Sequence, residues 1–155
     1  VRLLVVDDDE LDRMAVRRLL GQTGLRAELA EAVDGLQAAE LLLARAFDCV
    51  LMDVHLPTLD GPTLLRRIQA MGVESPVIML TVQGDEALAV ELMKAGASDY
   101  LNKSQLDAPR LGAAVRGAMK LAQAQQAAQQ AAQGHCAAGS QQMAAGGGPE
   151  GGVFV

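Results

Sequence analysis

The sequence predicts an α/β protein in which helices cover both faces of a parallel β-sheet. Short apolar runs alternate along the chain with longer segments that have helical periodicity. Two of these runs, residues 49–53 and 76–80, are continuously apolar, which is typical of strands buried on both faces. Aromatic residues make up only 2% of a chain that is 50% apolar, so the core is expected to be aliphatic.

Five strands are expected, each bounded by turn residues or by the start of a helical pattern. The run at 26–30 is the weakest, because small and charged residues interrupt it. The predicted strands are residues 2–6, 26–30, 49–53, 76–80 and 99–101.

A helical segment follows each strand. Glycines end several of these segments, and Pro62 suits the first turn of the third one. A fifth helix is expected to begin between Ser104 and Pro109. The other predicted helices are residues 9–20, 34–45, 60–71 and 85–97.

The alternation of strand and helix restricts the topology. Right-handed crossovers between parallel strands leave few possible orders. One of them is the flavodoxin-like, doubly wound sheet with strand order 2-1-3-4-5 and five helices. We take this order as the prediction.

Charge divides the chain into three parts. All 13 lysines and arginines lie before residue 121, and residues 1–120 are predicted to form the folded domain. Residues 121–133 are an uncharged Ala/Gln stretch with high helix propensity, expected to extend the last helix. Residues 134–155 have low complexity and are expected to be disordered.

Composition also argues against several classes of partner. The net charge of −6 disfavours direct binding to nucleic acid or to anionic membranes. No apolar run approaches the roughly 20 residues that span a bilayer. Two cysteines far apart in the sequence indicate no disulfide framework, so the cytoplasm is the expected location.

Chemically active side chains follow four of the predicted strands. Asp7 and Asp8 come after the first strand, and Asp53 comes at the end of the third. Thr81 comes after the fourth strand, and Lys103 after the fifth. Ligands of doubly wound sheets bind at the carboxyl ends of the strands. We therefore expect these residues to converge on one site.

This combination suits phosphoryl transfer. A group of carboxylates forms an oxygen-rich site of the kind that Mg²⁺ occupies. A carboxylate such as Asp53 can attack phosphorus and form an aspartyl phosphate. Lys103 and Thr81 would supply the cation and the hydrogen-bond donor that stabilise the transferred group.

Four segments carry a family resemblance. They are "LLVVDDDE" at residues 3–10, "CVLMDVHLPTLDG" at 49–61, "VIMLT" at 77–81 and "AGASDYLNK" at 95–103. Together, in this order and spacing, they resemble the receiver domain of two-component response regulators, such as chemotaxis regulators. The resemblance covers residues 1 to about 120.

The resemblance implies a role for each matching residue. Asp53 would accept a phosphoryl group, and Lys103 would pair with the resulting acyl phosphate. Thr81 and Tyr100 would be the switch residues that change the face formed by the fourth helix, fifth strand and fifth helix. The implied Mg²⁺ ligands are Asp7, Asp8, Asp53 and the backbone carbonyl of His55.

Two positions depart from the family pattern. Ser104 stands where the family usually has proline, which makes a cis peptide before it less favourable. Val82 stands where alanine or glycine is usual, and its bulk is expected to narrow access to Asp53. His55, Val82 and Gln83 flank the phosphoryl site and are expected to set the lifetime of the phosphorylated state.

The implied partners are a histidine kinase or histidine phosphotransfer protein and an output domain or effector; a homodimer is also possible. The chain is interpreted as a signalling module that catalyses only its own phosphorylation and dephosphorylation. Two alternatives stay open. One is an aspartyl-phosphate-forming phosphatase of the haloacid-dehalogenase kind, and the other is a degenerate receiver that acts only as a protein-interaction module.

The four acidic residues at 7–10 are expected to have different roles. Asp7 and Asp8 face the strand-end site, whereas Asp9 caps the first helix and Glu10 begins it. Without a metal ion, repulsion within the site predicts that removing either Asp7 or Asp8 stabilises the fold.

Overall fold

A computed structural model describes the backbone of residues 1–57 and 59–139 and the side chains of residues 1–57 and 59–128. The chain divides into two units, Val1–Met119 and Lys120–Val155. The first unit contains the whole sheet. In the second, the backbone is helical from Lys120 to Gly139.

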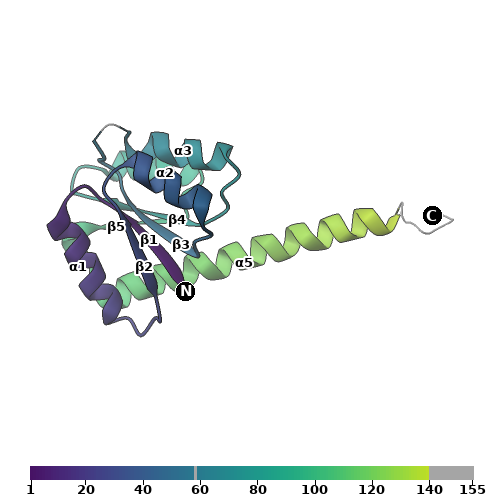
Figure 1. Cartoon of the computed structure of the whole chain (residues 1–155), viewed down its shortest axis with the longest axis horizontal. Coiled ribbons are helices and arrows are strands. Elements are labelled where there is room, and N and C mark those ends of the chain that lie inside the picture. The colour runs from purple at the N-terminus through teal and green to yellow at the C-terminus, as the bar shows by residue number, and fades with distance from the viewer. Residues whose placement is uncertain (58, 140–155) are drawn as a thin grey trace. The chain divides into compact units, whose positions relative to one another are not determined.

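The sheet confirms the predicted topology. Five parallel strands lie in the order β2-β1-β3-β4-β5, and β1 lies between β2 and β3 (Figure 1). Strand order therefore reverses beside β1, the position where doubly wound sheets form their sites. The strands are β1 (Arg2–Val6), β2 (Glu28–Ala32), β3 (Cys49–Asp53), β4 (Val77–Thr81) and β5 (Asp99–Asn102).

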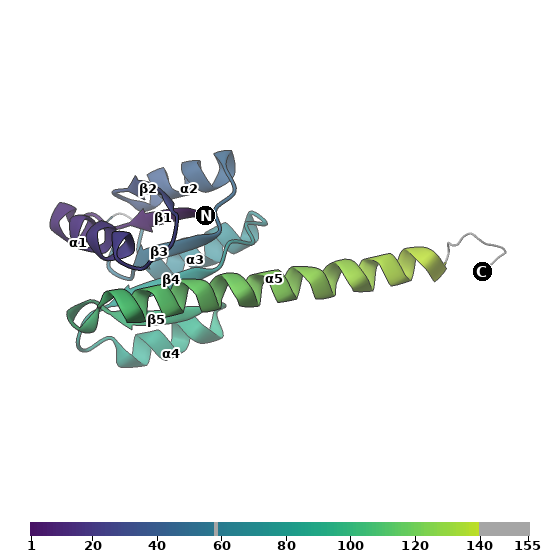
Figure 2. The ribbon, with the colours of Figure 1, turned by 90° about the horizontal axis from the view of Figure 1, so that it is seen from below.

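Helices cover both faces of the sheet. Helix α1 and the first turns of α5 pack on one face, whereas α2, α3 and α4 pack on the other. Figure 2 shows α4 beside β5, the edge strand. The helices are α1 (Glu10–Gly21), α2 (Gly35–Ala44), α3 (Gly61–Ala70), α4 (Glu86–Lys94), α5 (Ala108–Gly139) and a short 3-10 turn, η1 (Lys103–Gln105).

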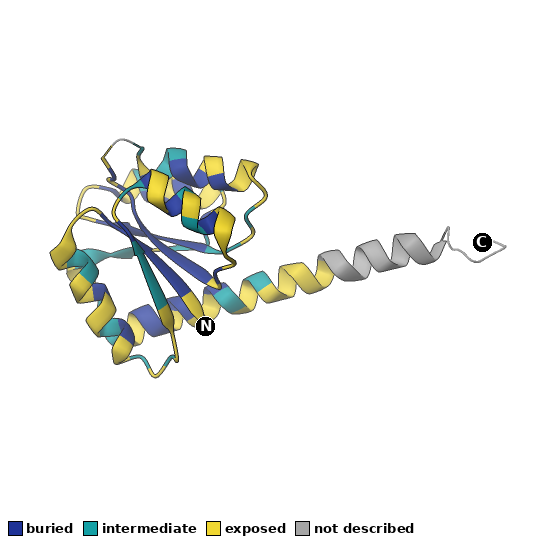
Figure 3. Cartoon of the chain, viewed as in Figure 1, coloured by how far each residue is buried: buried dark blue, intermediate teal, exposed yellow. Residues whose placement is uncertain are grey.

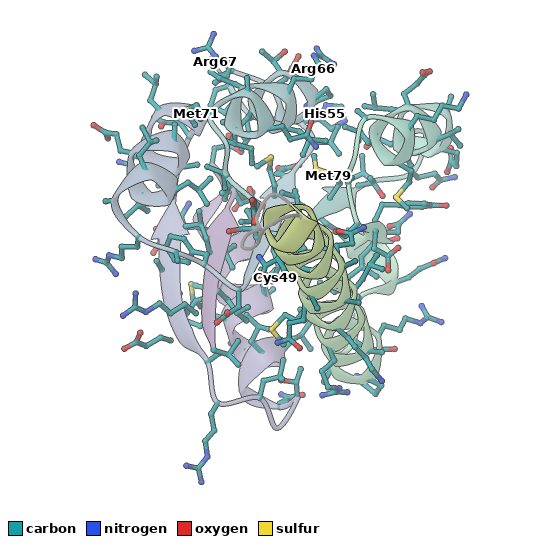
Figure 4. The ribbon with its side chains drawn as sticks, turned by 90° about the vertical axis from the view of Figure 1, so that its right-hand side faces the viewer. Cys49, His55, Arg66, Arg67, Met71 and Met79 are labelled. Atoms are coloured by element: carbon teal, nitrogen blue, oxygen red, sulfur yellow. The ribbon has the colours of Figure 1, made fainter. Side chains whose placement is uncertain are left out.

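Alternating strand residues build two aliphatic cores. Leu4 packs toward α2, α3 and α4, whereas Leu3 packs toward α1 and α5. Figure 4 shows the same division in Met79, on the side of α3 and α4, and Cys49, on the opposite side. Strands β3 and β4 are buried along their whole length (Figure 3), which explains why most of each strand is a continuous apolar run.

Aspartate side chains cap α1, α2 and α3. The carboxylate of Asp9 accepts the Leu11 N–H at 2.8 Å, which confirms that Asp9 is the N-cap of α1. Asp34 and Asp60 cap α2 and α3 in the same way. These caps fix the point where each strand-end loop turns into a helix.

Strand β2 corrects the sequence prediction. It spans Glu28–Ala32 rather than 26–30, because its register is set by β1, from Arg2 opposite Glu28 to Val6 opposite Ala32. The edge position leaves most of the strand only half-buried. A local apolar pattern therefore could not indicate its bounds.

Other bounds differ from the expectation as well, those of β4 and α4 among them. Strand β4 includes Thr81, so this residue ends the strand instead of following it. Helix α4 ends at Lys94 and not at 97, because Gly96 adopts a left-handed φ of 114°.

Towards the C-terminus, the structure describes the backbone as far as Gly139. The Ala/Gln stretch at 121–133 is helical, and α5 continues to Gly139, into the segment that was expected to be disordered. Residues 140–155 lie outside the described residues. Among the helices that the structure does describe, none has the length and apolarity needed to cross a membrane.

Candidate functional site

The carboxyl ends of β1, β3 and β5 bring three of the predicted side chains into contact. Asp7 follows β1, Asp53 ends β3, and Lys103 begins the 3-10 turn after β5. These residues are far apart in the sequence and meet only because parallel strands end at the same edge of the sheet.

Lys103 lies at the centre of this site. Its Nζ donates to Asp7 Oδ2 at 2.7 Å, to Asp12 Oδ2 at 2.8 Å and to Asp53 Oδ2 at 3.1 Å. An ammonium group has three N–H donors, so these carboxylates use all of them. Burial disfavours the charged amine, but the hydrogen bonds that it donates to Asp12, Asp7 and Asp53 outweigh this effect and raise the pKa of Lys103.

Asp7 is the most deeply buried of these acids. Its residue exposure is 0%, and burial raises the pKa of its carboxyl above the ordinary value despite the hydrogen bond from Lys103. The other carboxylate oxygen accepts the Asp9 N–H at 3.0 Å, while Arg13 donates to the Asp7 carbonyl. Asp7 is therefore held rigidly between β1 and the first turn of α1.

Both oxygens of Asp53 are engaged. Oδ1 accepts the backbone N–H of His55 at 3.0 Å, and Oδ2 accepts Lys103. The side chain of Asp53 is 9% exposed, so it reaches solvent only at the site itself. Such a carboxylate is fixed in orientation at the end of a rigid strand.

The carboxylates also fit a small, hard cation. One oxygen each from Asp7, Asp8 and Asp53 lies within 4.8 Å of the others. Two oxygens bound to one octahedral Mg²⁺ are about 3–4 Å apart. Small side-chain movements would therefore bring the three carboxylate oxygens to the spacing that Mg²⁺ requires. Asp8 is exposed, whereas Asp7 and Asp53 are buried, which leaves one side of the cluster open to water and ligands.

Thr81 is buried, but its hydroxyl is turned away from the carboxylates. It donates to the Leu101 carbonyl on the neighbouring strand β5 at 3.3 Å. Tyr100 lies on β5 and is 44% exposed. In this conformation the two predicted switch residues are near the site without contacting Asp53.

The loops that flank the site are linked by Asp85. The His55 ring, after β3, bonds to the Asp85 carboxylate through Nε2 at 3.0 Å, and the Val82 N–H donates to Asp85 at 3.0 Å. Burial favours the neutral acid, but these hydrogen bonds from Val82 and His55 hold the pKa of Asp85 below its ordinary value. Figure 4 shows His55 on the side of the sheet covered by α3 and α4.

Three predicted residues lie on the loops after β3 and β4, and none of their side chains hydrogen-bonds to Asp7, Asp8 or Asp53. His55 is exposed, as are Val82 and Gln83 on the loop after β4. The backbone carbonyl of His55 stays a predicted ligand. Ser104 lies in the 3-10 turn, where its N–H and hydroxyl both donate to Asn102 Oδ1, and the described residues contain no cis peptide bond.

Sequence reasoning missed two residues of the site, Asp12 and Asp85. Asp12 lies in the first turn of α1, just after the Asp9 cap, so the predicted helix start could have placed it beside the strand-end acids. Asp85 was interpreted only as the start of a helix. It is the N-cap of α4, yet its side chain makes no capping hydrogen bond and faces His55 and Val82 instead.

In sequence, the chain is similar to curated response regulators. The chain is 40% identical over 103 residues to the response regulator MprA of Mycobacterium sp. (strain KMS), a match over 66% of this chain and 44% of that protein. MprA of Mycobacterium tuberculosis (strain ATCC 25177 / H37Ra) is 38% identical over the same coverage. The chain thus spans less than half the length of the curated relatives it matches.

Solved structures give the same result. The signal receiver domain of an HD domain-containing protein from Pseudomonas fluorescens Pf-5 superposes with a TM-score of 0.72 at 33% identity, over 81% of this chain and 90% of that one. Full-length FixJ from B. japonicum superposes with a TM-score of 0.72 at 36% identity, over 78% of this chain and 58% of that one.

The family model of the response regulator receiver domain matches residues 3–116, which include all the strand-end side chains described above. The relatives and superposed structures agree with that match. The chain therefore belongs to the bacterial response regulator receiver domains of two-component systems.

Proposed function

We propose that this chain is the phosphoacceptor module of a two-component phosphorelay, with Asp53 as the phosphorylated residue. The observation that carries the proposal is the contact of Lys103 with Asp53 and Asp7, beside a third acid, Asp8. A nucleophile, a fixed cation and a carboxylate cluster suited to Mg²⁺ lie at one strand edge. Phosphoryl transfer needs these components together.

In the proposed reaction, a carboxylate oxygen of Asp53 attacks the phosphorus of a phosphohistidine on a partner protein. The P–O bond forms as the P–N bond breaks, and the electron pair and a proton from solvent go to the departing imidazole. The Lys103 ammonium moves from Asp53 to the transferred phosphoryl oxygens and offsets their charge. Asp7, Asp8, Asp53 and the His55 carbonyl would hold Mg²⁺, which neutralises charge on the same oxygens.

The proposed output is a conformational change at Thr81 and Tyr100. The Thr81 hydroxyl would exchange the Leu101 carbonyl for a phosphoryl oxygen, and the exposed Tyr100 ring would move inward. This rearrangement would alter the face made by α4, β5 and α5. His55, Val82 and Gln83 would set how long the phosphoryl group persists before water removes it.

The proposed partners are a histidine kinase or histidine phosphotransfer protein and an output domain or effector. Because the chain covers 44% of the MprA relatives, the comparisons do not support the expectation that the whole protein has no nucleic-acid partner. That expectation is limited to this acidic stretch of chain.

The test is phosphorylation of the purified chain. Incubation with Mg²⁺ and a phosphohistidine donor should add about 80 Da, the mass of one phosphoryl group, and beryllofluoride should bind in its place. Asp53→Asn should abolish both. Asp48→Asn is the matched control, because Asp48 is the acid that precedes the opposite end of β3. An adduct that survives Asp53→Asn refutes the proposal, and turnover of phosphate esters would favour a phosphatase.

A further inference from the structure

The third carboxylate on Lys103 has no role in the mechanism above. Asp12 Oδ2 accepts from Nζ at 2.8 Å, a shorter contact than that of Asp53 at 3.1 Å. Asp12 comes from the first turn of α1, whereas Asp7 and Asp53 lie at strand ends. Its side chain is 42% exposed, so it lies at the outer side of the site.

Asp12 is also outside the carboxylate set that fits a cation. That set consists of Asp7, Asp8 and Asp53. Two of the three partners of Lys103 therefore belong to the metal set, and Asp12 is the remaining one. A divalent cation bound beside Lys103 would draw Asp7 and Asp53 toward itself and would repel the ammonium group.

We propose that Asp12 is a positioning residue that keeps Lys103 at the site when Mg²⁺ takes its other carboxylate partners. With one N–H held by Asp12, the ammonium group keeps two donors for the phosphoryl oxygens. Asp12 touches neither the phosphoryl group nor the metal ion and acts only through Lys103. The inference rests on the proposed function, because it concerns the stage at which Asp53 carries a phosphoryl group or its mimic.

The alternative is that Asp12 competes with the phosphoryl group for Lys103. If Asp12 and the phosphoryl group competed for the same N–H, Asp12 would weaken the phosphorylated state. The geometry favours positioning, because Lys103 already donates to Asp12 and Asp53 at the same time.

The experiment compares Asp12→Asn with Glu10→Gln. Both substitutions remove one negative charge from the first turn of α1 and nearly preserve side-chain shape, so long-range charge and helix-dipole effects are matched. Titration calorimetry would measure the affinity for Mg²⁺ alone and for beryllofluoride at saturating Mg²⁺. Asp12→Glu, which keeps a carboxylate, is the rescue variant.

We expect Asp12→Asn to weaken beryllofluoride binding about three- to tenfold relative to Glu10→Gln, with Mg²⁺ affinity within about twofold of that control, and Asp12→Glu to recover most of the loss. Equal beryllofluoride affinities in Asp12→Asn and Glu10→Gln overturn the inference. So does tighter binding by Asp12→Asn, which indicates competition, or an equal loss of Mg²⁺ and beryllofluoride affinity. If the wild-type chain binds no beryllofluoride, the proposed function fails and this inference fails with it.

Discussion

His55 and Asp85 join the two loops that flank Asp53. The His55 Nε2 lies 3.0 and 3.1 Å from the two carboxylate oxygens of Asp85, although the residues are 30 positions apart in the sequence. Asp85 also accepts the Val82 N–H, next to the predicted switch residue Thr81. The position of the loop after β4 is thus tied to the loop that follows β3.

This link predicts unequal effects of removing its two partners. His55→Ala should lower the free energy of unfolding by less than about 1 kcal/mol, because the ring is 59% exposed. Asp85→Ala should cost about 1–3 kcal/mol, since the Val82 N–H also loses its acceptor. Urea denaturation measures both, with Gln83→Ala on the same loop as the control. Equal losses for His55→Ala and Asp85→Ala would contradict this account.

Gly61 predicts a steric constraint beside the site. A Cβ at this position would lie 2.7 Å from Met79 Cε and 2.8 Å from the Asp53 carbonyl oxygen. Gly61→Ala should therefore cost about 1–3 kcal/mol of stability and should also weaken beryllofluoride binding, because the backbone at Asp53 must shift. Gly117→Ala, where a Cβ meets nothing within 4 Å, is the control and should not weaken either property.

Asp60 predicts a pH dependence of stability. Hydrogen bonds from the Thr63 side chain and backbone hold the pKa of Asp60 below its ordinary value of 3.8. A depressed pKa means that the charged form stabilises the fold above the unfolded pKa, and that this contribution disappears as pH falls through the folded pKa. Asp60→Asn keeps a capping oxygen without the charge. The wild type should therefore exceed Asp60→Asn in stability near pH 6, and the difference should vanish near pH 2 in urea melts. A constant difference would refute the assignment.

Removing Asp7 and removing Asp8 are predicted to have opposite effects on the stability of the fold when no metal ion is bound. The structure revises the expectation that removing either one is stabilising, because Asp7 is buried and bonds to Lys103 and the Asp9 N–H. In the presence of a chelator, Asp7→Ala should lower the free energy of unfolding by about 1–3 kcal/mol. Asp8→Ala should raise it by up to about 1 kcal/mol, because repulsion within the site is reduced. Thermal melts would measure both.

Added Mg²⁺ provides the control for this prediction. It should stabilise the wild type by binding the folded state and should stabilise Asp8→Ala much less. Destabilisation by Asp8→Ala in chelator would contradict the repulsion argument.

The position of Val82 leads to a prediction for the rate of phosphorylation by small phosphodonors. Its side chain is 42% exposed on the loop after β4, and only its backbone N–H bonds to Asp85. Val82→Ala should keep the loop in place while widening access to Asp53, and should speed phosphorylation by acetyl phosphate a few-fold. Mass spectrometry over time would measure the rate, with Val90→Ala on α4 as the control. An unchanged rate would show that Val82 does not limit access.

Much of the fold could be predicted from local patterns. Residues 49–53 were predicted as a strand and form β3, because a strand buried on both faces is apolar along most of its length, here from Cys49 to Met52. Strand β2 was misplaced because an edge strand needs little apolar surface and takes its bounds from pairing with β1. Helix starts were predictable at Asp9 and Asp60, where the capping residue bonds to the backbone nearby in the sequence.

The sequence by itself determined which residues gather at the strand ends. The order of strands and helices was enough to predict that Asp7, Asp53 and Lys103 share one edge, because parallel strands end on the same side. Only the tertiary structure decided how they are paired. Asp12 joins Lys103, and Asp85 turns from capping α4 to bond with His55. Those contacts depend on how α1 and the strand-end loops pack on the sheet, and packing between distant segments leaves no local pattern in the sequence.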